Sequence, residues 1–133
     1  SNNIMKISWV NGCFDVLHRG HLELFKFAKS KADLLFVGID ADARVKQFKG
    51  DSRPINNQQD RKFFLESLRF VDRVVVFNNE DQLIEIVKMI SPDYMIIGSD
   101  YKYKRVIAKE HAKELIFFDR IGDYSTTNIL ERK

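Results

Sequence analysis

Two histidines, His18 and His21, lie three residues apart with Gly20 between them, and this spacing suggests contact with phosphate. An apolar run precedes them and a segment with helical apolar spacing follows, so they lie where a buried strand passes into a helix. In open α/β sheets ligands bind at such positions, and a helix N-terminus favours an anion. Imidazole donors, and a glycine that lets phosphate approach the backbone, therefore predict a nucleotide site.

The histidine pair has two other interpretations: polar residues at a helix start, or half of a zinc site. Zinc requires further cysteine or histidine ligands. The sequence holds one cysteine, Cys13, and one further histidine, His111, and their spacing does not indicate a cluster. Nucleotide binding is the preferred interpretation because of the residues that flank the pair.

Strand and helix signals alternate along the whole chain. Strands are expected at 4–10, 34–39, 73–77, 94–97 and 115–118, and helices at 19–31, 40–46, 57–68, 80–90, 106–113 and 125–131. Asp40 or Asp42 is a candidate cap for the short helix at 40–46. The alternation predicts a Rossmann-like, doubly wound α/β fold, with a mainly parallel five-stranded sheet and helices on both faces.

Composition bounds the class of protein. The 133 residues, 44% hydrophobic, predict a single domain over residues 1–133, with 1–3 interpreted as a cloning remnant. The net charge of +3 does not indicate a nucleic-acid partner. No apolar run approaches the roughly 18 residues of a membrane span. With a single cysteine and no visible signal peptide, these features lead us to expect a cytoplasmic protein without a membrane partner.

Three motifs together suggest a family. Residues 12–21 follow the pattern Gly-x-Phe-Asp-x-x-His-x-Gly-His, which resembles the signature of the cytidylyltransferase-like nucleotidyltransferases. Residues 53–55 with 60–61 resemble the middle motif of that family, and 124–129 resemble its closing Ser-Thr-Thr motif. The resemblance covers nearly the whole chain. It implies transfer of a nucleoside monophosphate from ATP or CTP, accompanied by Mg²⁺, to a small phosphorylated acceptor, with release of pyrophosphate.

The resemblance also implies roles for individual residues. The catalytic residues, which would contact phosphate and stabilise the transition state, are expected to be His18, His21, Lys46 and Arg120. The nearby Lys49 is interpreted as a solvated loop charge. The expected nucleotide-binding residues are Gly12, Phe14, Asp15, Gly20, Arg61, Gly98, Asp100, Ser125, Thr126 and Thr127. The expected substrate-binding residues are Asp15, Lys46 and Arg53. No residue is assigned as a direct metal ligand.

Several of these residues have a structural alternative. Arg61 is either a phosphate clamp or an exposed helix arginine, and Phe14 either lines the nucleotide pocket or packs the strand end. The Ser-Thr-Thr segment either caps the last helix or binds phosphates with the same unpaired N–H groups. Asp15 and Asp100 either bind Mg²⁺ indirectly, bind acceptor hydroxyls, or orient a cation such as Lys46. Cys13 is interpreted as a small buried filler.

The substrates are indicated by two sets of residues that disagree. Residues 42–50, 98–102 and 124–129 are similar to the adenylyltransferase domain that acts on heptose 1-phosphate, and this interpretation is preferred. Residues 64–72 and Arg120 are instead similar to glycerol-3-phosphate cytidylyltransferase. A non-catalytic nucleotide-binding regulatory module is the alternative from another class. Relatives commonly form dimers, so a homodimer is expected from the resemblance.

Overall fold

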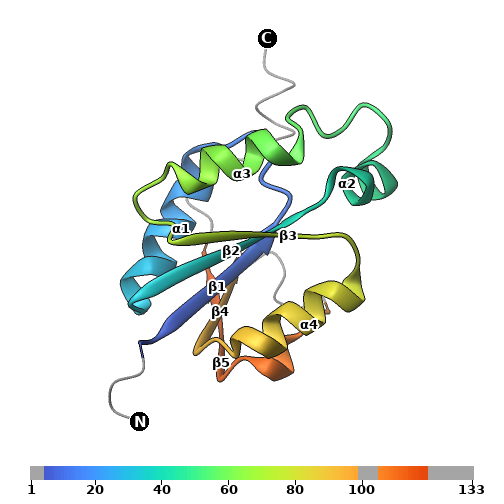
Figure 1. Cartoon of the computed structure of the whole chain (residues 1–133). Coiled ribbons are helices and arrows are strands. Elements are labelled where there is room, and N and C mark those ends of the chain that lie inside the picture. The colour runs from blue at the N-terminus through green and yellow to red at the C-terminus, as the bar shows by residue number, and fades with distance from the viewer. Residues whose placement is uncertain (1–4, 99–104, 120–133) are drawn as a thin grey trace.

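The chain folds into a parallel sheet with helices on both faces (Figure 1). The computed structural model describes residues 5–98 and 105–119. The strands lie in the order β3-β2-β1-β4-β5, and every neighbouring pair is parallel. Their bounds are β1 Ile7–Gly12, β2 Leu34–Asp40, β3 Arg73–Phe77, β4 Tyr94–Gly98 and β5 Glu114–Phe118. This topology confirms the predicted doubly wound α/β fold with five strands.

Each face of the sheet carries its own apolar core. Helices α1 (Arg19–Lys31) and α3 (Gln58–Glu66) cover one face, and α4 (Glu80–Ile90) covers the other (Figure 1). The first core includes Phe25 of α1 and Leu65 of α3, and the second includes Leu83 of α4. Such two-sided burial explains why the strands are almost continuously apolar.

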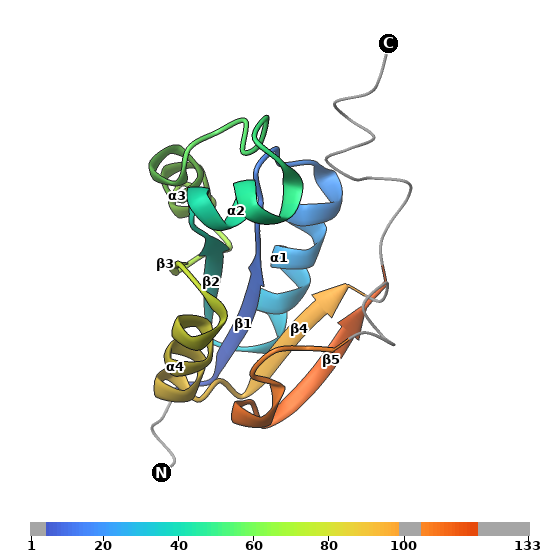
Figure 2. The same cartoon turned by 90° about the vertical axis from the view of Figure 1, so that its right-hand side faces the viewer.

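The strand order reverses at β1, which has β2 on one side and β4 on the other. Helices on the two sides of such a strand diverge, and the carboxyl ends of the neighbouring strands then border a crevice. Helix α2 (Asp42–Lys49) follows the end of β2, on the same side of the molecule as the carboxyl ends of these strands (Figure 2). The histidine-containing turn after β1 therefore opens at the switch point of the sheet.

The start of α2 differs from the sequence prediction, which placed a short helix at 40–46. The N-cap is Ala41, which makes no side-chain cap, so the proposed capping by Asp40 or Asp42 is wrong. The backbone N–H of Asp42 instead donates to Oε1 of Gln58 at 2.9 Å. A side chain from the next helix thus satisfies this helix terminus, which local sequence rules do not anticipate.

The helix predicted at 106–113 is also wrong. This segment contains only a short 3-10 helix, Lys109–His111, preceded by Ala108 in the left-handed region at φ 67°. A non-glycine residue in that region interrupts a right-handed helix. Ala108 is buried in the second core, and Val106 and Ile107 pack against it. The apolar residues therefore face inward as expected, but from an irregular segment.

Candidate active site

A cavity of about 680 Å³ lies at the carboxyl ends of the strands, between the start of α1 and helix α2. This volume is within the usual range for a small-molecule site. The predicted site residues that line it are Gly12, Phe14, Asp15, His18, Gly20, His21 and Gly98. Arg53, Arg61 and Lys46 do not line it. The signature turn and the end of β4 are thus brought together as the motifs predict.

The two imidazoles are held by a reciprocal cap at the start of α1. The backbone N–H of His18 donates to Nδ1 of His21 at 3.2 Å, and the backbone N–H of His21 donates to Nδ1 of His18 at 3.4 Å. The rings stack with their centroids 3.7 Å apart. Because each Nδ1 accepts, the neutral form of each ring carries its hydrogen on Nε2. Two Nε2–H donors are therefore fixed at a helix N-terminus that lines the cavity.

Phe14 is held in a strained backbone conformation beside the histidines. Its φ is 47°, in the left-handed region that bulky residues rarely occupy. The ring meets His21 at 5.3 Å and Phe25 at 5.0 Å between centroids, in both cases edge to face. Such strain concentrates at functional sites. Phe14 both lines the cavity and packs in the first core, so its two interpretations hold together.

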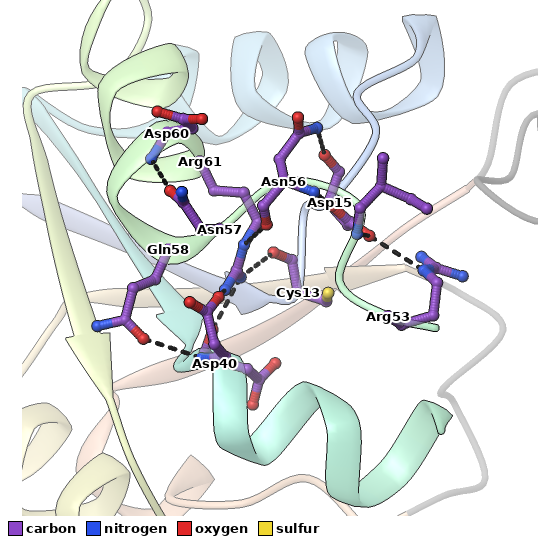
Figure 3. A network of polar contacts seen from close by, with 11 residues as sticks. Cys13, Asp15, Asp40, Arg53, Asn56, Asn57, Gln58, Asp60 and Arg61 are labelled. Atoms are coloured by element: carbon purple, nitrogen blue, oxygen red, sulfur yellow. Dashed lines mark hydrogen bonds and ion pairs between the residues drawn. The ribbon is translucent and has the colours of Figure 1, made fainter. Parts of the chain in front are cut away.

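The carboxylate of Asp15 binds the loop before α3. Asp15 is 2% exposed, and its oxygens accept from the backbone N–H groups of Ile55 at 2.7 Å and Asn56 at 2.8 Å (Figure 3). Nε of Arg53 donates a further hydrogen bond at 3.0 Å. Burial raises the pKa of Asp15, but these hydrogen bonds outweigh it and leave the pKa below its ordinary value. Of the predicted roles, the geometry favours orientation of a cation, which is Arg53 rather than Lys46.

The guanidinium of Arg53 has one unsatisfied hydrogen-bond donor group. Its Nε is committed to Asp15, while Nη2 is buried and has no hydrogen-bond partner within the described part of the chain. A buried unsatisfied donor in a native structure calls for a specific explanation, of which a bound ligand is one. The predicted substrate contact of Arg53 remains untested, and this unsatisfied Nη2 is consistent with it.

Arg61 is the centre of the polar network beneath the site. It is 0% exposed, so the alternative of an exposed helix arginine is wrong. Four of its five N–H groups donate to this chain, at 2.8 to 3.0 Å (Figure 3). The acceptors are the carbonyls of Asn56, Cys13 and Asp40 and Oδ1 of Asp42. Arg61 thus joins the signature turn, the end of β2 and the start of α2, and its predicted phosphate contact remains untested.

Helix α2 presents Lys49, and not Lys46, to the cavity. Lys49 is among the lining residues, whereas Lys46 is exposed and is not. Both lysine side chains are exposed, so the difference between them is that Lys49 borders the cavity and Lys46 does not. The lysine expected to be a solvated charge is therefore the one that borders the site.

Sequence reasoning missed part of the cavity wall. Asp40 at the end of β2 and Arg44 and Phe48 on α2 line it, and the spacing of four between Arg44 and Phe48 could have shown that they share one face of the helix. Cys13 also lines the cavity and is only partly buried, so it is more than a core filler. Burial raises the pKa of the Cys13 thiol, and this effect outweighs the nearby Lys49 and Arg61 cations, which lower it. The raised pKa favours the protonated thiol.

Other predicted residues lie outside the described ranges. These are Asp100, Arg120, Ser125, Thr126 and Thr127. The helix predicted at 125–131 lies there as well.

Comparison with known proteins identifies the family. The model of the cytidylyltransferase-like family matches residues 9–132. The chain belongs to this family. It is 47% identical over 127 residues to the bifunctional protein HldE of a Nitratiruptor species, covering 96% of this chain and 27% of that protein. It is 46% identical over 131 residues to HldE of Helicobacter pylori (strain G27), covering 98% of this chain and 28% of that protein. The chain thus spans about a quarter of the length of these curated relatives.

Solved structures show the same architecture. A lipopolysaccharide core biosynthesis protein from Thermoplasma volcanium GSS1 matches with a TM-score of 0.68 and 26% identity, covering 91% of this chain and 99% of that one. Pantoate-β-alanine ligase from Francisella tularensis matches with a TM-score of 0.66 over 99% of this chain and 69% of that one. At 18% identity, the second likeness bears on the fold alone. The family resemblance and the fold predicted from the sequence are both confirmed.

Magnesium has no dedicated protein site among the described residues. In residues 5–98 and 105–119, no group of three or more histidine, cysteine, aspartate or glutamate side chains could hold a metal ion. The carboxylate of Asp15 is engaged by three donors, and Asp40 accepts from Nε of Arg44 at 2.7 Å. Mg²⁺ at phosphate sites is commonly held by the substrate phosphates and water. The described residues suit a metal that arrives with the nucleotide.

Proposed function

We propose that this chain transfers a nucleoside monophosphate from a nucleoside triphosphate to a small phosphorylated acceptor, with release of pyrophosphate. The observation that carries the proposal is the pair of reciprocally capped imidazoles, whose Nε2–H groups are fixed at the start of α1 beside the cavity. Membership of the cytidylyltransferase-like family supports the same class of enzyme, a nucleotidyltransferase.

The reaction requires charge stabilisation rather than a protein nucleophile. An ionised phosphate oxygen of the acceptor attacks the α-phosphorus, the bond from that phosphorus to the bridging oxygen breaks, and pyrophosphate leaves with the electron pair. No proton has to move in this step. Charge spreads over the equatorial and leaving oxygens, where fixed donors lower the barrier. The Nε2–H groups of His18 and His21 and the helix N-terminus supply these donors, and Mg²⁺ enters as part of the nucleotide substrate.

The remaining residues position the substrates. Asp15 and Arg61 hold the loop at 53–56 and the start of α2 against the signature turn. The predicted contact between Arg53 and the phosphate of the acceptor stays a proposal, which the unsatisfied Nη2 supports although Arg53 does not line the cavity. We assign Lys49 to the triphosphate because it lines the cavity. Lys49 thereby takes the phosphate role predicted for Lys46, while the roles predicted for Gly98 and the residues beyond the described ranges stay proposals.

For the substrates, we propose ATP and a sugar 1-phosphate of the heptose class. The support is the resemblance of residues 42–50, 98–102 and 124–129 to the adenylyltransferase domain that acts on heptose 1-phosphate, together with the similarity to bifunctional HldE proteins. The similarity to a lipopolysaccharide core biosynthesis protein at 26% identity agrees with it. The glycerol-3-phosphate alternative rests on the resemblance of residues 64–72 and Arg120, and none of the similar proteins reported above adds support to it.

The test is pyrophosphate release with Mg²⁺ and each combination of ATP or CTP with heptose 1-phosphate or glycerol 3-phosphate. The proposal predicts turnover with ATP and heptose 1-phosphate that exceeds every other combination. Turnover only with CTP and glycerol 3-phosphate would contradict the substrate assignment but keep the reaction class. Nucleotide binding without turnover in any combination would instead support a regulatory module. Binding is measured by thermal shift, since a ligand of the native state raises the melting temperature.

We infer a homodimer and a cytoplasmic location from the family resemblance and composition. None of the helices in the described ranges is long and apolar enough to cross a bilayer. The oligomeric state is measured by light scattering, where twice the 15.6 kDa chain mass is expected.

A further inference from the structure

The cavity lining comes from both sides of β1, the strand that leads into the histidine turn, and these two sides are called its halves here. One half lies over β4 and β5, where Gly98 and Phe118 line it. The other half lies over β2 and β3 and is walled by α2, which contributes Arg44 and Phe48. A transfer between two bound molecules requires both to reach the imidazoles from different directions. Each half therefore suits one substrate.

Three different side chains lie in a row on this side of the cavity: Asp40 at the end of β2, and Arg44 and Phe48 on α2. Nε of Arg44 donates to Oδ1 of Asp40 at 2.7 Å, and both side chains are mostly buried. The Arg44 guanidinium carbon lies 4.8 Å from the ring centroid of Phe48 and 5.7 Å from that of Phe77. A carboxylate, a guanidinium and an aromatic ring thus follow one another along the cavity, and Arg44 holds its two neighbours in place.

Phe48 is unusual within this row. Its side chain is 66% exposed, and it lies beside the cavity next to the charged pair Arg44 and Asp40. An apolar ring left open at a concave site commonly serves ligand contact. The cation beneath it fixes its orientation, so the ring presents a defined surface.

This combination fits a phosphorylated sugar ring better than a short polyol. A pyranose has an apolar face of C–H groups that packs on an aromatic ring, together with hydroxyls that need both donors and acceptors. The Asp40 carboxylate can accept from hydroxyls, and the N–H groups of Arg44 other than Nε can donate to hydroxyl or phosphate oxygens. Glycerol 3-phosphate has no ring face to place on Phe48.

We propose that Asp40, Arg44 and Phe48 form the acceptor sub-site and select a phosphorylated sugar ring through stacking on Phe48. This inference rests on the proposed function for the identity of the acceptor. It assigns the nucleotide to the other half of the cavity, over β4 and β5.

Calorimetric binding tests the sub-site without turnover. Heptose 1-phosphate is titrated into the protein saturated with a non-hydrolysable ATP analogue and Mg²⁺. Phe48→Ala is expected to weaken the sugar phosphate about tenfold, the size of one lost ring contact. Phe48→Tyr keeps the ring and is expected to restore affinity to within about twofold. The matched control is Phe63→Ala, because Phe63 is equally exposed at 66% but lies on α3 away from the cavity.

Three results would overturn the sub-site. The first is a Phe48→Ala variant that binds the sugar phosphate as tightly as the unaltered protein. The second is a Phe63→Ala variant that loses as much affinity as Phe48→Ala. The third is a Phe48→Ala variant that binds the ATP analogue, and not the sugar phosphate, more weakly, which would place the base on Phe48. Absence of sugar phosphate binding to the unaltered protein would also reject it. Pyrophosphate release is measured in parallel, because it shows whether the protein is a nucleotidyltransferase even when it does not bind the sugar phosphate. A protein that turns over glycerol 3-phosphate but does not bind the sugar keeps the reaction class and loses the sub-site.

Discussion

Replacement of Arg61 by methionine is expected to destabilise the fold far more than removal of an ordinary helix arginine. Methionine approximates the length and apolar stem of arginine but makes none of its hydrogen bonds. Arg61 is 0% exposed and makes four hydrogen bonds, three of them to backbone carbonyls in three different segments. Removing it leaves those carbonyls without their partner and the Asp42 carboxylate unpaired.

The magnitude follows from these contacts. Breaking a buried ion pair by removing one partner costs about 3–5 kcal/mol. Asp42 is partly exposed and can recover some hydration, which lowers the cost, while the three carbonyls raise it. We therefore expect a loss of about 4 kcal/mol in the free energy of unfolding, which is a large part of the total of about 5–15 kcal/mol typical of domains. For a chain of this size, the melting temperature should fall by roughly 12 °C.

The assay is urea denaturation of Arg61→Met, Arg61→Lys and the control Arg19→Met. Arg19 is 70% exposed and lies 3.6 Å from Glu23 on α1, so its loss should cost no more than about 0.5 kcal/mol. Arg61→Lys keeps the charge without the planar fork and should fall between the two. A loss of under about 1 kcal/mol in Arg61→Met, similar to the control, would refute the view that this network holds the site together.

Three other substitutions test particular contacts. The pKa of Asp15 is lowered in the folded state, because the hydrogen bonds from Asn56, Ile55 and Arg53 outweigh the effect of burial. It therefore contributes stability above its unfolded pKa of about 3.9, and that stability is lost as the pH falls through the folded value. Chemical denaturation should show that Asp15→Asn has a lower free energy of unfolding than the unaltered protein, by a constant amount from about pH 5 to 8. This difference should become smaller below about pH 4. A difference that does not change with pH would contradict the prediction. In steady-state kinetics, Lys49→Ala should lower kcat/KM for ATP by about tenfold or more, while Lys46→Ala should change it less than about twofold. The reverse order of effects would reassign the phosphate contact to Lys46.

Local patterns were sufficient for most of the fold. The predicted bounds at 19–31, 73–77 and 80–90 coincide with α1, β3 and α4, because apolar periodicity and flanking polar residues mark their ends. The 106–113 segment has equally helical apolar spacing, but Ala108 takes a left-handed backbone conformation that no side-chain pattern signals. The displaced start of α2 depends on Gln58, which is 16 residues away from its partner.

For the site as well, local contacts could be predicted from the sequence and long-range contacts could not. Motif spacing found the histidines and the glycines of the signature turn, because these contacts are local. The burial of Arg61 could not be predicted, since its partners come from segments 5 to 48 residues distant that meet only in the folded chain. The choice between Lys46 and Lys49 likewise depends on which face of α2 borders the cavity.

The paired imidazoles provide the most direct test of the account. His18 also caps α1 through Nδ1, so His18→Ala should lower the free energy of unfolding by about 1 kcal/mol. His18→Asn keeps a capping oxygen but loses the Nε2–H donor. With ATP, Mg²⁺ and heptose 1-phosphate, we predict that His18→Asn melts within about 2 °C of the unaltered protein and binds ATP. Its rate of pyrophosphate release should fall by about 100-fold or more. A His18→Asn variant that releases pyrophosphate at the unaltered rate would contradict the assignment of this imidazole to the transition state.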